Sequence, residues 1–342
     1  MAWPLIRNLP VRTNLRFVKF ATFAAFVSIA GILLSFASML TGGLRENPIE
    51  IYNAAEGPPM HRIGQVLERG FNLGIDFRGG TMLEFEAPSD IDIGAVRAAV
   101  ENLELGDVQV QAFSDPRRAQ IRYESPAQDA AETAQRVENV ISENVPGVNF
   151  LAREVVGPKV SDELFTGGLI ALGLAILLML IYIWFRFEWQ FGVGAILGLF
   201  HDVILTLGMF SIFRIEFTLT IIAALLTIIG YGINDTVVVF DRLRENLRKY
   251  KKMPLSEVVE LSLNETLSRT IITGCTALLA LTGLLYFGGA ALSGFAIAMI
   301  FGIITGTYSS IYVAAPAILL WGVKRGREGE QAGKTKAAEQ AG

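Results

Sequence analysis

The sequence predicts an α-helical integral membrane protein with six transmembrane helices and one small α+β domain between the first and second helices. The 342 residues are 52% hydrophobic and 18% charged, which is too apolar for a soluble domain and too charged for membrane helices alone. The charge is also uneven, because residues 41–163 contain 21 acidic and 11 basic side chains. Composition therefore separates an acidic extramembrane domain from membrane helices with basic flanks. The single cysteine, Cys275, excludes an intrachain disulfide.

The N-terminal segment, residues 1–19, is predicted to be cytoplasmic. It carries four basic residues, Arg7, Arg12, Arg16 and Lys19, before an uncharged run that extends from residue 20 to residue 44. This run is longer than the apolar core of a cleaved signal peptide. We therefore expect the first transmembrane helix at 20–40.

The hydrophilic region 41–163 shows the alternation of strands and the periodicity of amphipathic helices. We expect strands at 81–87, 107–113, 119–125 and 148–156, and helices at 92–103 and 127–145. The resulting order, βαββαβ, is typical of the ferredoxin-like fold.

A glycine-containing stretch, FNLGIDFRGG at 71–80, precedes the first of these strands. It lacks the lysine and hydroxyl residue of a phosphate-binding loop, and no helix is expected to follow it. We interpret it instead as a tight turn that leads into the strand at Thr81.

The rest of the chain returns to the membrane in five apolar runs. They predict transmembrane helices at 164–185, 189–213, 217–240, 268–287 and 292–321, the last two divided by Gly288 and Gly289. The loop 241–267 contains an amphipathic helix at 254–267, and the tail 324–342 is predicted to be disordered.

Basic residues fix the expected orientation of these helices. They cluster before the first span, at Arg186, between the fourth and fifth spans, and after the sixth span. These places share one side of a six-helix topology, so the positive-inside rule puts both termini in the cytoplasm and the acidic domain outside. Asp241, near the cytoplasmic end of the fourth span, is expected to balance Arg242 or Arg244.

Asp235 is the principal candidate for a functional residue, because it lies within the fourth apolar run. A carboxylate in hydrocarbon costs several kcal/mol, so such a group is a functional candidate by default. With helical spacing it shares one stripe with five residues: Thr220, Ala224, Thr227, Tyr231 and Arg242. The alternative is that Asp235 reaches the cytoplasmic interface or is paired only for packing.

Arg269, at the start of the fifth span, is the candidate partner of Asp235. A nearby cation favours the ionised form of a carboxylate, so movement of Arg269 toward or away from Asp235 would switch the acid between releasing and holding a proton. The alternative is an ordinary interfacial arginine. Tyr231, Asn234 and Thr273 are candidate supporting polar residues.

A second polar pair, His201 and Asp202, lies near the centre of the third span. Gly194, Gly198, Asp202 and Thr206 recur every four residues, which permits close approach of another helix, as does a second ridge in the sixth span made by Gly294, Ala298, Gly302, Gly306 and Ser310. The pair can serve packing or carry protons. Metal binding is disfavoured, because the chain has only two histidines.

Five motifs resemble the SecF family, the smaller membrane subunits of bacterial SecDF protein-export complexes in the resistance-nodulation-division superfamily. They are FNLGIDFRGG (71–80), VVGPKVSDEL (155–164), FHDVILTLG (200–208), GYGINDTVVVFDRLRE (230–245) and NETLSRTIITG (264–274). Together they extend over most of the chain. The resemblance places the acid of the family's NDT motif at Asp235 and the arginine of its SRT motif at Arg269, as proton-relay residues.

The resemblance further implies a multi-pass protein of the bacterial inner membrane with a periplasmic domain. Its implied partners are SecD, the SecYEG channel and exported unfolded polypeptides, with YajC and YidC as further candidates and membrane lipid around the helices. The implied work is a late step of polypeptide export, driven by the proton-motive force.

Other classes of function have less support in the sequence. It shows no nucleophile with an adjacent base, no nucleotide loop and no metal cluster, so we expect no enzyme activity and no cofactor other than protons as the coupling ion. No nucleic-acid partner is expected. Two alternatives remain: an exporter of small molecules or lipids on the same superfamily scaffold, and a passive scaffold for export factors.

Overall fold

The computed structural model describes residues 13–323 except 46, 55–68, 104, 107, 114 and 124–129. The chain divides into two compact units. The sheet unit consists of Asn72–Ala171 and Glu216–Leu219, and the membrane unit of Met1–Phe71, Leu172–Ile215 and Thr220–Gly342. The predicted tail 324–342 lies outside the described residues.

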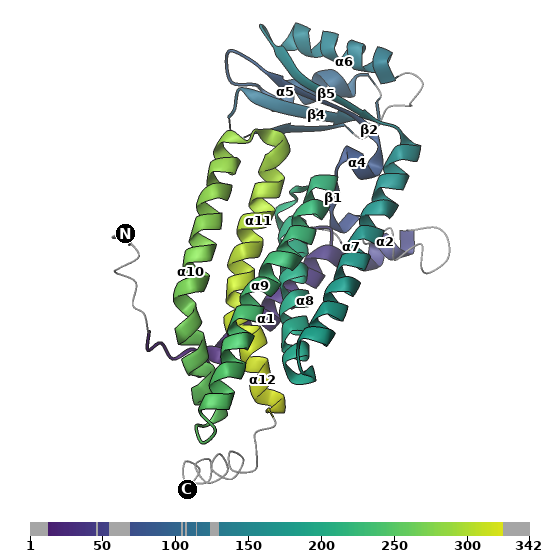
Figure 1. Ribbon diagram of the computed structural model, residues 1–342. Helices are drawn as coiled ribbons and strands as arrows, with labels where there is room; N and C mark the ends of the chain where they lie inside the picture. Colours follow the sequence, from purple (N-terminus) through teal and green to yellow (C-terminus); the bar gives the residue numbers. More distant parts are fainter. Residues whose placement is uncertain are drawn as a thin grey trace, which may run out of the picture. The chain divides into compact units, whose positions relative to one another are not determined.

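The sheet unit is built on a four-stranded antiparallel sheet in the order β3-β4-β2-β5. The strands are β2 (Gly80–Glu86), β3 (Gln109–Ala112), β4 (Arg118–Tyr123) and β5 (Asn149–Val156). Helices α5 (Ile93–Glu101) and α6 (Ala130–Asn144) lie on one face of the sheet (Figure 1). This order and these crossovers confirm the predicted ferredoxin-like arrangement.

The core of this fold follows from the alternation in its strands. Leu83, Phe85 and Ile121 point from β2 and β4 to the helix side and are 0% exposed. Helix α5 begins where Asp92 accepts hydrogen bonds from the backbone N–H groups of Gly94 and Ala95, which satisfies two otherwise unpaired donors.

The glycine motif at 71–80 forms more than the predicted turn. Strand β1 (Asn72–Leu73) and the four-residue helix α4 (Ile75–Arg78) come first, and Gly79 and Gly80 then take positive φ values of 75° and 116°. The turn into β2 is therefore confirmed, whereas β1 and α4 inside the motif were not predicted. β1 pairs in parallel with β6 (Glu216–Phe217), which connects the third and fourth long apolar helices.

Side chains reinforce this short strand pair. Arg122 of β4 forms an ion pair with Glu216 at 3.0 Å, and the side chains are only 7% and 18% exposed. Gln120 donates a second hydrogen bond to Glu216 at 3.2 Å. Asp76 accepts a hydrogen bond from the backbone N–H of Leu219 at 2.8 Å. Residues 216–219 are thus held in the sheet unit by both backbone and charge.

We predict that Glu216→Ala weakens the sheet unit strongly, because it leaves Arg122 buried without this carboxylate. Loss of one partner of a buried ion pair costs about 3–5 kcal/mol. Hydrogen exchange of the Gly74 amide, which donates to Phe217 O at 2.9 Å, measures the local opening. Asp115→Ala, which breaks an exposed pair with Arg117, is the matched control and should cost about 0–1 kcal/mol. Equal exchange in both variants would contradict the prediction.

In the described part of the chain, six helices are long and apolar enough to cross a membrane. They are α1 (Phe17–Leu40), α7 (Pro158–Arg186), α8 (Trp189–Phe213), α9 (Leu219–Lys249), α10 (Leu255–Phe287) and a composite of α11 (Ala290–Ser309), a π-helical turn (Ser310–Ala314) and α12 (Ala315–Trp321). A short helix, α2 (Pro48–Ala54), follows α1. The predicted number of spans and the division at Gly288 and Gly289 are confirmed.

Several helices extend beyond the predicted spans, and α7 begins at Pro158 instead of residue 164. α9 continues to Lys249, and α10 joins the expected amphipathic helix and the fifth span into one helix from Leu255. The physical reason is the absence of any proline or glycine between Leu255 and Arg269, so nothing interrupts the backbone hydrogen bonding. The π-helical turn was not predicted.

Small residues bring the central helices of the membrane unit together. A Cβ atom at Gly194 of α8 would lie 2.7 Å from Ala314 O, and one at Gly302 of α11 would lie 2.5 Å from Ile228 of α9. These close approaches confirm the two predicted small-residue ridges. In the apolar stretches of α8 and α9, more than half of the residues are buried inside the protein. In the corresponding stretches of α7 and α10, only 6% and 11% are buried. α7 and α10 therefore present most of their apolar surface outward.

Candidate functional site

Asp235 lies in the middle of α9 and is only 3% exposed. It forms no hydrogen bond or ion pair with any residue in the described part of the chain. The predicted stripe around it is only partly uniform, since Ala224 is buried like Asp235 whereas Thr220 and Thr227 are exposed. The stripe thus runs along the boundary between the core and the outer surface of α9.

Arg269 stands level with Asp235 on the neighbouring helix. Tyr231 Oη donates a hydrogen bond to Thr273 O at 3.1 Å, which fixes the register of the antiparallel helices α9 and α10. One turn onward on α9 is Asp235, and one turn back on α10 is Arg269. The guanidinium acts on the carboxylate by electrostatic attraction, while its own side chain is exposed and no ion pair closes between the two described residues.

Four of the predicted site residues are therefore brought together: Tyr231, Asp235, Arg269 and Thr273. Asn234 is exposed, and no hydrogen bond joins it to this group among the described residues. The arrangement can hold a carboxylate in two states, one neutral and shielded and one ionised with a cation in reach. A buried acid beside an exposed cation is suited to taking up and releasing a proton.

Further along the same two helices, polar side chains that sequence reasoning missed join α9 to α10. Arg242 Nε donates to Glu265 at 2.7 Å. Asn246 Nδ2 donates to Glu265 at 2.8 Å and to Ser262 at 3.0 Å, and Asn246 is 1% exposed. A signal was present for Ser262 and Glu265, which lie in the helix predicted to be amphipathic, but not for Asn246, which lies in a stretch predicted to be loop.

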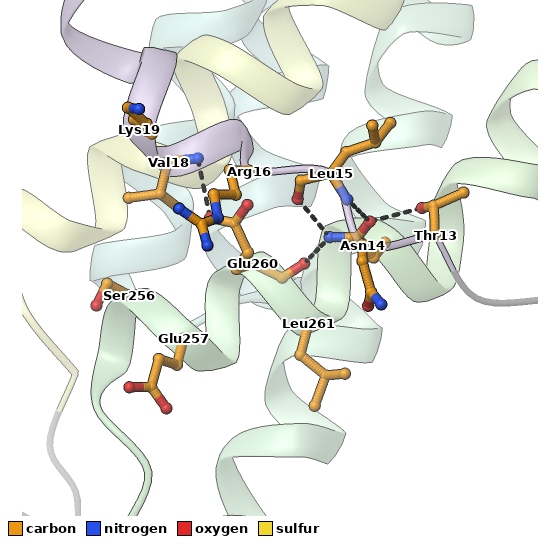
Figure 2. Close-up of a pocket in the computed structure, with 11 residues that line it drawn as sticks. Thr13, Asn14, Leu15, Arg16, Val18, Lys19, Ser256, Glu257, Glu260 and Leu261 are labelled. Atoms are coloured by element: carbon orange, nitrogen blue, oxygen red, sulfur yellow. Dashed lines mark hydrogen bonds between the residues drawn. The ribbon is translucent and has the colours of Figure 1, made fainter.

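The start of α1 is attached to α10 by a second missed residue, Asn264. Its Oδ1 accepts hydrogen bonds from Thr13 Oγ1 at 2.6 Å and from the Leu15 N–H at 2.9 Å, and its Nδ2 donates to Leu15 O. Figure 2 shows the neighbouring bond, in which the Val18 N–H donates to Glu260 at 3.0 Å. A pocket of about 460 Å³ opens beside these contacts. They fix the N-terminus of α1 on the helix that carries Arg269.

Asp241 differs from the sequence expectation. It pairs with Arg186 through two contacts of 2.6 Å, not with Arg242 or Arg244. The short turn between α7 and α8 brings Arg186 to the C-terminal part of α9, whereas Arg242 is occupied by Glu245 and Glu265.

His201 and Asp202 form a separate group in the bundle interior. His201 Nδ1 lies 2.9 Å from Asp202 Oδ1, and Ser309 of α11 donates to Asp202 Oδ2 at 2.8 Å. The two residues are 2% and 5% exposed. Among the described residues no group of three or more His, Cys, Asp or Glu side chains could hold a metal ion.

Two family models match the chain. The model of the protein export membrane protein SecD/SecF, C-terminal, matches residues 136–324, more than half of the chain. The SecD/SecF GG motif matches residues 66–87, the segment that contains β1 and the turn into β2.

Curated relatives and solved structures agree with these matches. The protein translocase subunit SecF of Cereibacter sphaeroides is 49% identical over 76% of this chain and 83% of its own length. SecF of Rickettsia bellii is 45% identical over 75% and 85%, respectively. The crystal structure of SecDF from Thermus thermophilus, described as a translocon-associated membrane protein, matches with a TM-score of 0.74 and 33% identity over 92% of this chain. This chain spans only 39% of that SecDF chain.

Proposed function

We infer that this chain, which belongs to the SecF family of protein translocase subunits, couples proton entry to a late step of polypeptide export across the bacterial inner membrane. In this proposal Asp235 takes up a proton and Arg269 controls its release. The sheet unit works in the periplasm, both termini lie in the cytoplasm, and the proton is the coupling ion. The chain needs no catalytic chemistry of its own for this work.

The observation that carries the proposal is a buried acid level with an exposed cation on the adjoining helix. An ionised Asp235 carboxylate in an apolar interior has a high free energy. Either protonation of the carboxylate or the approach of the Arg269 guanidinium lowers it. The two outcomes require different spacings of α9 and α10. Alternation between them would convert proton binding into helix movement.

The energy available is sufficient for such a step. One proton that crosses a potential of about 100 mV releases ~2.3 kcal/mol from the electrical component. This shifts a two-state equilibrium by roughly fiftyfold, since a factor of ten corresponds to about 1.4 kcal/mol.

The proposed principal partner is SecD. The SecDF chain that resembles this protein is more than twice as long as the matched part, and the outward apolar faces of α7 and α10 supply surface for further membrane helices. The SecYEG channel and the exported, unfolded polypeptide are proposed as the assembly in which the pair works. YajC, YidC and membrane lipid are further candidate contacts.

Export by inverted membrane vesicles that contain SecYEG, SecD and this chain tests the proposal. We expect the part of export that depends on this chain to disappear when a protonophore collapses the proton gradient at constant ATP. Vesicles that lack the chain are the control, and should respond less to the protonophore. An unchanged contribution of the chain without a gradient would favour a passive scaffold.

A further inference from the structure

We propose that His201 and Asp202 form a second proton-binding site, in which one additional proton is shared between the imidazole and the carboxylate. The site lies at the meeting point of α8, α9 and α11 and is distinct from Asp235. The inference rests on the proposed function for its role in export, although the site itself can be tested without any export assay.

The first observation is that the pair is buried without a compensating charge. Both oxygens of Asp202 are occupied, one by His201 Nδ1 and the other by the Ser309 hydroxyl. No lysine or arginine in the described part of the chain pairs with Asp202. Among the described residues, the titratable side chain that packs against the pair is that of Tyr308 of α11, whose ring stacks on His201 with 5.8 Å between the ring centroids. With a neutral imidazole the site carries one negative charge, which one proton would cancel.

The second observation is an unused nitrogen. His201 Nε2 is buried and has no hydrogen-bond partner among the described residues. The short contact at Nδ1 is formed either by an N–H donating to a carboxylate or by a carboxylic acid donating to the ring. If the added proton goes to the ring, Nε2 becomes N–H. If it goes to Asp202, the neutral ring changes tautomer and Nε2 again becomes N–H. Protonation of His201 Nε2 therefore reports proton uptake, whichever of the two residues takes up the proton.

The third observation is a small cavity beside the carboxylate. It measures about 10 Å³ and lies between α8 and α9, lined by residues that include Asp202, Gly232 and Thr236. This is close to the space that one water molecule requires. A water there would have the Asp202 carboxylate and the Thr236 hydroxyl as partners. Such a water would extend the polar group of His201, Asp202 and Ser309 to α9.

The fourth observation is that three helix backbones meet at this carboxylate. A Cβ atom at Gly232 of α9 would lie 3.1 Å from Asp202 Oδ2, and one at Gly306 of α11 would lie 3.3 Å from Gly232 Cα. At these two glycines no side chain separates the carboxylate from the helix backbone. The π-helical turn begins at Ser310, directly after the residue that donates to Asp202, and such turns often occur at functional sites. A change of charge at Asp202 would therefore act on α9 and α11 together.

Nuclear magnetic resonance of the imidazole nitrogens tests this site directly. The chain has only two histidines, so the His61→Gln variant, labelled with ¹⁵N-histidine and studied with SecD in lipid nanodiscs, reports on His201 alone. We expect Nε2 to change from unprotonated to protonated as the pH is lowered between about 8 and 5. Asp202→Asn should move this transition by at least one pH unit. Ser309→Ala, which removes a hydroxyl but no titratable group, should retain the transition.

A purely structural pair would give a different result. Its imidazole would keep one tautomer and one protonation state throughout the pH range, in both the parent and Ser309→Ala, and this would overturn the proposal even if Asp202→Asn failed to fold. A different result would contradict the proposed function and leave the His201–Asp202 site intact. If Asp235→Asn leaves export unchanged while His201 still titrates, the second site stands and the assigned role of Asp235 does not.

Discussion

Asp235→Asn is expected to abolish the gradient-dependent part of export while the complex with SecD still assembles. Asparagine has nearly the same shape, but it cannot take up or release a proton, so the roughly fiftyfold bias that one proton supplies would be lost. The measurement is the rate of export in vesicles, with and without protonophore, alongside recovery of SecD by affinity purification.

A control on the same helix separates this effect from the loss of any charge. Asp241→Asn removes an exposed carboxylate that pairs with Arg186, and exposed pairs contribute about 0–1 kcal/mol. We expect this variant to export at close to the parental rate. Equal rates for Asp235→Asn and the parent would show that the buried acid has no role in coupling.

Arg269→Met is expected to reduce gradient-driven export by about 5- to 150-fold, the usual range for a coupling between two sites. Methionine keeps the apolar length of the side chain and removes the cation that attracts Asp235. Arg269→Lys should recover part of the activity, because it restores the charge but not the planar geometry. Export rates of the three proteins at equal membrane abundance provide the measurement.

The double variant Asp235→Asn, Arg269→Met distinguishes a working pair from two independent residues. Residues that act as a unit give strongly non-additive losses. The double variant should therefore be no worse than Asp235→Asn alone. If the two losses multiply, Arg269 acts on something other than Asp235.

Patterns that repeat along the chain allowed most of the fold to be predicted. The alternation of residues in β2 and β4 and the lengths of the apolar runs are local signals. Both correspond to elements of the structure, because burial of apolar side chains determines where these elements form. The same holds for Gly288 and Gly289, which end α10 and begin α11. The burial of Asp235 follows from its place in an apolar run, whereas its role stays a prediction.

Contacts between distant short segments were not predictable in this way. Strands β1 and β6 have two residues each and lie far apart in sequence, so neither carries a periodic pattern. The partner of Asp241 was wrongly predicted for a related reason. Neighbours on the same helix were considered, whereas the observed partner, Arg186, comes from the α7–α8 turn. The alignment of Arg269 with Asp235 likewise depends on the register of two helices, which single-helix spacing does not contain.

Strand β6 also determines how many covalent links run between the two units. Because residues 216–219 belong to the sheet unit, the backbone passes from one unit to the other after Phe71, Ala171, Ile215 and Leu219. A unit joined by one backbone connection can rotate freely, but a unit joined by four can move only in ways that keep all four connections intact. Two of these connections are the adjoining ends of α8 and α9, so a shift of either helix along its axis would act on the sheet unit through only a few residues of backbone.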